Sequence, residues 1–79
     1  MSLYPTKTRL ALLQAVADGK AHVETSPPYD SYAAGMGKVT ARCEEMYRAG
    51  WIEQGGEFGA FVRNYRLTNL GREVLEAAQ

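Results

Sequence analysis

The sequence has very little of the chemistry that metal sites and covalent catalysis require. Its 79 residues include one cysteine, Cys43, and one histidine, His22. A lone cysteine cannot form an intrachain disulfide, which is consistent with a reducing compartment. Zinc sites and nucleophile–base pairs need several such groups placed together. We therefore expect no metal, no cofactor and no enzyme activity. Cys43 is expected to pack as a small apolar residue, and His22 to lie at a surface or an edge.

Long apolar runs are also missing. No stretch approaches the roughly 20 apolar residues that a membrane-spanning helix requires. The N-terminal segment MSLYPTKTR has no apolar core of the kind that signal peptides carry. These absences predict a cytoplasmic protein without a membrane partner.

The chain has no net charge, because nine basic residues balance nine acidic ones. Nucleic-acid-binding domains are often basic overall, so this balance counts against that function. The distribution is uneven, because residues 38–72 contain six basic and four acidic residues. The local surplus is small, and the electrostatic attraction of one copy to DNA would be modest.

No linker, repeat or low-complexity segment divides the chain, so we expect one domain over residues 1–79. A domain of this size buries only about 60% of its unfolded surface, which leaves a thin stability margin. The three glycines at 55, 56 and 59 do not form a phosphate-binding loop, because no GK[ST] follows them.

The second half of the chain has the clearest organisation. Residues 38–49 place Val39, Cys43 and Met46 on one helical face, and Gly50 is suited to end that helix. An extended run begins at Trp51, the glycine-rich residues 54–60 suit a hairpin tip, and residues 61–67 alternate as a strand does. Thr68 can cap a final helix. The first half offers a helix over residues 7–17 and a short strand over 20–24.

The order of helix, hairpin and helix resembles the second half of a winged helix-turn-helix domain, and its motifs are similar to those of the MarR-like and PadR-like branches. The string MYRAGWI (46–52) matches the end of the recognition helix, with methionine in place of leucine. LTNLGR (67–72) matches the motif that follows the wing. The resemblance implies a winged helix, mostly α with a small antiparallel β-sheet (α+β).

Residues 25–37 depart from these families, which carry a regular bracing helix there. Ser26 could cap such a helix, with Pro27 at its first position. The prolines and glycines of TSPPYDSYAAGMG nevertheless favour at most a short, irregular helix.

The resemblance implies a small non-catalytic regulator that binds double-stranded DNA through the helix at about 38–49 and the wing at about 54–62. Helices of this kind read base edges in the major groove, and wings contact phosphate or the minor groove. The expected DNA-contacting residues are Lys38, Thr40, Ala41, Arg42, Arg48 and Arg63. Glu45 is a candidate acceptor from a base, whereas Glu44 is placed towards the flank. The alternative is a winged helix that binds protein and not DNA, which net neutrality and the two glutamates favour.

A homodimer through the terminal helices is also predicted. The first helix has two neighbouring apolar stripes, one with Leu10 and Leu13 and one with Leu12 and Val16, where a small core needs one. Leu75 of the last helix likewise falls beside the main stripe. We expect Leu12 and Leu75 to lie at the dimer surface, and two half-sites to multiply a weak single contact with DNA.

Overall fold

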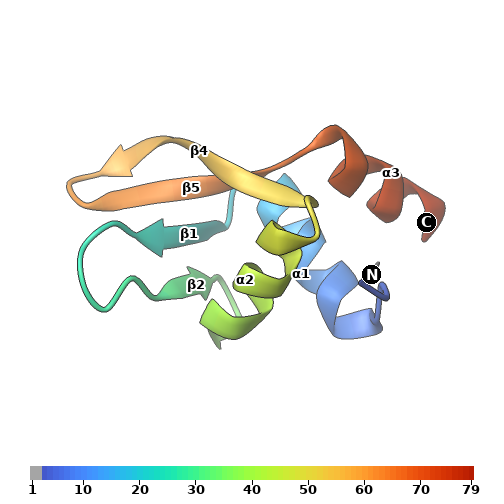
Figure 1. Cartoon of the computed structure of the whole chain (residues 1–79), viewed down its shortest axis with the longest axis horizontal. Coiled ribbons are helices and arrows are strands. Elements are labelled where there is room, and N and C mark those ends of the chain that lie inside the picture. The colour runs from blue at the N-terminus through green and yellow to red at the C-terminus, as the bar shows by residue number, and fades with distance from the viewer. Residues whose placement is uncertain (1–2) are drawn as a thin grey trace.

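The structure, a computed structural model, describes residues 3–79, apart from the side chains of residues 57 and 58. Figure 1 shows its elements as an elongated molecule of 35 × 23 × 19 Å. In chain order they are α1 (Lys7–Ala17), β1 (Ala21–Glu24), β2 (Ser31–Ala33), β3 (Gly37–Lys38), α2 (Thr40–Arg48), β4 (Ile52–Gly59), β5 (Val62–Leu67) and α3 (Asn69–Ala77).

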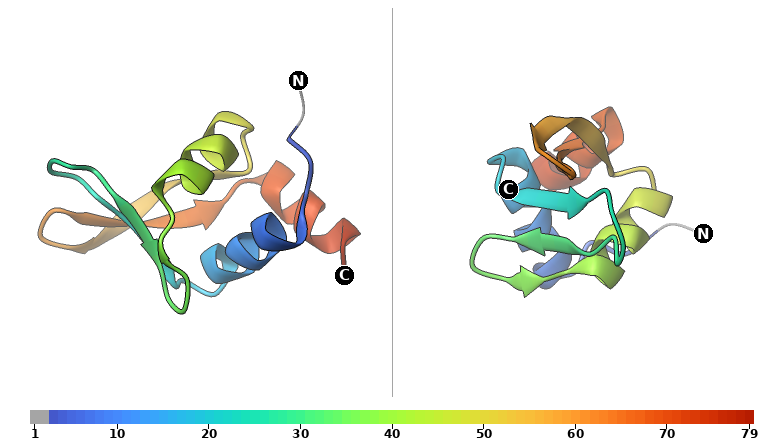
Figure 2. Two further views of the ribbon diagram at one scale, coloured as in Figure 1. Left: turned by 90° about the horizontal axis from the view of Figure 1, so that it is seen from below. Right: turned by 90° about the vertical axis from the view of Figure 1, so that its left-hand side faces the viewer.

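The α+β class is confirmed, but the sheet is larger than the sequence predicted. Its five strands pair antiparallel in the order β3-β2-β1-β5-β4. Figures 1 and 2 show the β1–β2 and β4–β5 hairpins extending side by side, away from the end where α1 and α3 lie. A hydrogen bond of 2.8 Å from the Thr25 amide to the Phe61 carbonyl joins the two hairpins near their tips.

The prediction of a short, irregular helix within residues 25–37 is wrong. This segment forms β2 and the first residue of β3 instead. Two glycines explain the difference: Gly35 and Gly37 have φ of 79° and 72°, in the left-handed region that no right-handed helix contains. Between the prolines and these glycines, Ser31 and Ala33 are buried on one side of β2. The segment thus adds two strands to the sheet on the far side of β1.

One face of the sheet carries the core. Buried residues alternate along β1, β2 and β5, as they do when only one face of a sheet is covered. Helices α1 and α2 supply the opposing side chains. The buried cluster consists of Leu12, Leu13, Val16, Ala21, Val23, Ala33, Val39, Cys43, Met46, Trp51, Ile52, Tyr65, Leu67 and Leu75.

Helix α1 uses both of its apolar stripes within a single chain. Thr6 caps the helix through the Arg9 amide at 3.3 Å, and Leu12 and Leu13 both have 0% of their surface exposed. Leu75 of α3 is buried as well. The placement of Leu12 and Leu75 at a dimer surface is therefore wrong, because the five-stranded sheet makes a wider core than the three-stranded one that was expected.

The β4–β5 hairpin is longer than predicted. Strand β4 continues to Gly59 and β5 begins at Val62, so the tip is residues 60–61 rather than 54–60. The pairing is irregular, with register shifts between Gln54 and Glu57 and again between Glu57 and Gly59. The glycines predicted to form the tip instead lie in this irregular part of β4.

A tight junction joins the end of α2, the start of β4 and the start of α3. Gly50, with φ of 80°, ends α2, and its carbonyl accepts a hydrogen bond from the Thr68 hydroxyl. The same hydroxyl caps α3 by accepting from the Gly71 amide at 3.0 Å. A Cβ atom at Gly71 would lie 1.9 Å from the Trp51 carbonyl oxygen. Only glycine at position 71 allows α3 to approach the backbone of residue 51 this closely.

We predict that Gly71→Ala destabilises the protein by about 2 kcal/mol or more, because backbone must move to admit one methyl group. The matched control is Gly56→Ala, since a Cβ there meets nothing within 4 Å and the residue has no positive φ. The control should change stability by less than about 0.5 kcal/mol. Chemical denaturation measures both, and equal stability of the two variants would contradict the close contact at Gly71.

A small polar cluster lies within this core. The Ser31 hydroxyl and the Tyr65 hydroxyl are 2.7 Å apart, and Ser31 also hydrogen-bonds the Cys43 thiol. Burial raises the pKa of Cys43 from 9.0 to about 11, against a smaller opposing effect of the bond to Ser31. The expectation that Cys43 packs in the core is confirmed, since its exposure is 0%.

Stability should consequently fall in alkaline solution. The folded chain holds the Cys43 proton more tightly than the unfolded chain, so the stabilisation is complete below pH 9 and is lost as the pH rises towards 11. The loss amounts to about 2 kcal/mol. Urea unfolding at a series of pH values measures it, with Cys43→Ala as control. If the variant retains the same alkaline slope as the wild type, the thiol is not its source.

Candidate nucleic-acid interface

Helix α2 buries one side and leaves the rest of its surface exposed. Cys43 and Met46 have 0% exposure, whereas six positions on the other sides of the helix face solvent. These exposed positions are Ala41, Arg42, Glu44, Glu45, Tyr47 and Arg48. The helix begins at Thr40 rather than near residue 38, because Lys38 belongs to β3 and Val39 is the N-cap.

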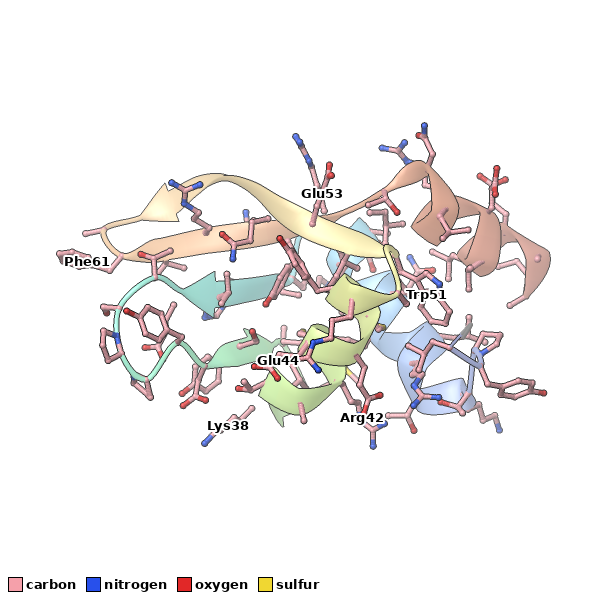
Figure 3. All side chains as sticks on the ribbon, viewed as in Figure 1. Lys38, Arg42, Glu44, Trp51, Glu53 and Phe61 are labelled. Carbon is pink, nitrogen blue, oxygen red and sulfur yellow. The ribbon has the colours of Figure 1, made fainter. Side chains whose placement is uncertain are left out.

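Four of the six predicted DNA-contacting residues come together at the N-terminal end of α2. Lys38, Thr40, Ala41 and Arg42 line a shallow depression of about 460 Å³, together with Val39 and Glu44. Figure 3 shows Lys38 and Arg42 on the side of the molecule away from β4. A basic surface with a small residue between the two cations is thus present at this end of the helix.

Two of those four residues are engaged within the chain. The Thr40 hydroxyl donates to Asp30 Oδ1 and accepts from the Ser31 amide, both at 2.9 Å. Lys38 Nζ lies 3.5 Å from Asp30 Oδ2, and its side chain stays 63% exposed. Thr40 therefore holds the β1–β2 loop against α2, and a contact between its hydroxyl and DNA would have to replace these bonds.

The two glutamates of α2 have the opposite orientations to those predicted. Glu45 Oε2 accepts from Arg9 Nη2 of α1 at 2.8 Å, so this side chain faces α1. Glu44, predicted at the flank, lines both the depression at the helix start and a groove beside β1 and β5. The apolar periodicity predicted which side of α2 is buried, but it did not predict which flank of the helix faces α1.

Arg48 and Arg63 lie apart from this N-terminal cluster. Arg48 lines the groove between α2 and the sheet. Arg63 is exposed on β5, directly opposite Val23 of β1, and Val23 also lines that groove. Since directly paired residues share a face, Arg63 lies on the same face of the sheet as α2. Arg66, three residues further on, lies on the other face and pairs with Glu53 at 2.6 Å.

The groove beside α2 was not predicted. It measures about 480 Å³ and lies between α2, the loop after β1, and strands β1, β4 and β5. Tyr29, Tyr47 and Tyr65 contribute three rings to it, and its charged residues are Glu24, Glu44 and Arg48. Burial raises the pKa of Tyr65 above 10.0, and the nearby Glu44 acts in the same direction. Tyr29 reaches the groove because residues 25–30 form a loop beside α2, and the adjacent prolines at 27 and 28 were the signal in the sequence that could have indicated this loop.

The lone histidine is part of the sheet. His22 lies on the central strand β1, half-buried, and its ring stacks on Tyr32 with centroids 5.6 Å apart. Within residues 3–79, no group of three or more histidine, cysteine or acidic side chains could hold a metal ion. No helix in the same range is long and apolar enough to cross a membrane.

Comparison of the chain with protein-family models, with curated proteins and with solved structures found no match.

Proposed function

We propose that the chain is a small non-catalytic DNA-binding domain, a variant of the winged helix that binds double-stranded DNA through α2 and the β4–β5 hairpin. The order α1, β1, α2, β4–β5, α3 supports this proposal. In this variant, β2 and β3 replace the helix that usually braces the recognition helix. Thr40, bonded to Asp30 and Ser31, takes over that bracing role.

The observation that carries the proposal is the position of the free cations. Arg42 and Arg48 are exposed on α2, and Arg63 lies on the sheet face from which α2 rises. Within the described residues, none of these three has a carboxylate within ion-pairing distance, in contrast to Arg9, Lys38 and Arg66. A duplex against α2 would meet two cations, Arg42 and Arg48, that no carboxylate among the described side chains neutralises, and a duplex against the hairpin would meet Arg63, the cross-strand neighbour of Glu57.

Binding by one copy would be weak. Three phosphate contacts, from Arg42, Arg48 and Arg63, correspond to a salt slope of about −3. Two copies on a two-fold symmetric site would double that number, so we retain the homodimer in the proposal. The dimer interface must differ from the one that the sequence predicted, because Leu12 and Leu75 are buried. Leu70, with 45% exposure on α3, and Tyr4, with 74%, are the exposed apolar candidates on the terminal segments.

A protein-binding domain is the second candidate, and one observation favours it. Glu44 faces outward between the cations of α2 and lines both hollows on this side of the molecule. A carboxylate at that place repels phosphate, whereas it is suited to a basic protein partner.

We predict that Arg63→Ala weakens binding to random duplex DNA and reduces the salt slope by about one unit. Arg66→Ala is the matched control, because it removes the same side chain from the opposite face of the same strand. It should leave affinity and slope unchanged. Fluorescence anisotropy at several salt concentrations measures both variants. Loss of affinity in the control but not in Arg63→Ala would contradict the proposed orientation.

Arg42→Ala should cost about 1–3 kcal/mol on a specific site if the guanidinium reads a guanine edge. Genomic fragments selected on the wild-type protein provide that site. A wild-type protein that shifts neither genomic fragments nor random duplex at low salt would remove the DNA proposal altogether.

Sedimentation equilibrium tests the homodimer. The wild type should sediment at twice 8.7 kDa at micromolar concentration. Leu70→Glu should dissociate it and leave the domain folded, whereas Leu12→Glu should unfold the domain, since Leu12 has no exposed surface. A wild type that remains at the monomer mass rules the dimer out.

A further inference from the structure

The groove between α2 and the sheet has a rigid floor and an aromatic lining. Tyr65 is only 7% exposed, and its hydroxyl is fixed by Ser31 at 2.7 Å. Tyr47 and Tyr29 form part of the walls and are 53% and 57% exposed. Two exposed tyrosines around a fixed third give a half-open cavity of about 480 Å³ with three rings available for contact.

Tyr29 keeps its place at a conformational cost. Its φ of 59° lies in the left-handed region, which a large aromatic residue rarely occupies. The turn is held by a hydrogen bond of 2.8 Å from the Tyr29 amide to the Ser26 carbonyl. Glycine or asparagine would suit this backbone better, so the turn places an aromatic residue at the groove in a conformation that disfavours it.

The charges of the groove indicate its occupant. Glu24 and Glu44 bring two negative charges and Arg48 brings one positive charge, so the lining is net negative. Asp30, on the adjoining loop, is already occupied by Thr40 and Lys38. Aromatic rings combined with carboxylates recognise a guanidinium, which stacks on rings and donates hydrogen bonds to carboxylates in its plane.

We propose that this groove binds an arginine side chain presented by another protein. The guanidinium would pair with Glu44 or Glu24 and lie against the tyrosine rings. This site does not depend on DNA binding, and it gives the partner chemistry of the protein-binding alternative. Among the described residues that line the groove, Arg48 alone carries a positive charge like that of the guanidinium, and it should weaken the binding that Glu44 supports.

The test is a titration of the full chain with the tripeptide acetyl-Gly-Arg-Gly-amide, in which two-dimensional ¹⁵N–¹H NMR spectra follow the backbone amide chemical shifts. The matched probe replaces arginine with citrulline, which has nearly the same shape and no charge. Amides at Glu44, Tyr47 and Tyr65 should move with the arginine peptide and not with the citrulline peptide. Glu44→Gln should weaken binding about two- to fivefold, and Arg48→Gln should tighten it by a similar factor.

Glu45→Gln is the control variant, because this carboxylate is adjacent in sequence but faces α1 and Arg9. It should bind the arginine peptide as the wild type does. Tyr47→Leu retains apolar surface and removes the ring, so it should weaken binding about as much as Glu44→Gln.

Four outcomes would overturn the proposal. Equal binding of the citrulline peptide would show a neutral occupant, whereas tighter binding by Glu44→Gln together with weaker binding by Arg48→Gln would show an anionic one. Tighter binding of free L-arginine than of the peptide would indicate a small metabolite. Shifts of the groove amides with protein concentration alone would indicate a second copy. The DNA proposal stands or falls separately, since Arg48→Gln should weaken DNA binding while it tightens peptide binding.

Discussion

The close contact between Gly71 and the carbonyl of Trp51 is the constraint on which the rest of the structure depends. At this point α3 lies directly against the first residues of the hairpin, and a single added carbon atom would be 1.9 Å from the carbonyl oxygen. Thr68 joins the same place to the end of α2, because its hydroxyl bonds both Gly50 and Gly71. The direction in which α2 leaves the sheet, and with it the groove and the exposed cations, follows from this junction.

Local signals in the sequence predicted the junction well and the first half of the sheet poorly. The glycine after α2 and the threonine before α3 are recognisable because helix ends depend on neighbouring residues alone. Strands β2 and β3 depend on pairing with β1 across a turn, which no local pattern records. Ser26 and Pro27 offered a start for a short helix within residues 25–37, and the left-handed Gly35 and Gly37 excluded one.

The side-chain partners explain why the candidate site could be predicted only in part. The helix that carries most of the expected DNA contacts was placed to within about two residues at its start. The apolar periodicity does not give the rotation of α2 relative to α1. The predicted positions of Glu44 and Glu45 were therefore interchanged. The ion pairs Arg9–Glu45 and Lys38–Asp30 join residues from different elements. Which cations remain free for a partner is therefore a property of the tertiary structure, and DNA and a basic protein segment would share the part of α2 around Arg48.

The two edges of the sheet limit what else the molecule can do. At one edge, β3 consists of two residues and ends at Lys38. At the other, β4 is broken by two register shifts and carries Glu53 near its start. A strand from a second chain needs a long and regular row of free amides and carbonyls to pair with, and neither edge offers one. Even concentrated protein should resist the strand-to-strand polymerisation by which small sheet-containing domains form fibrils.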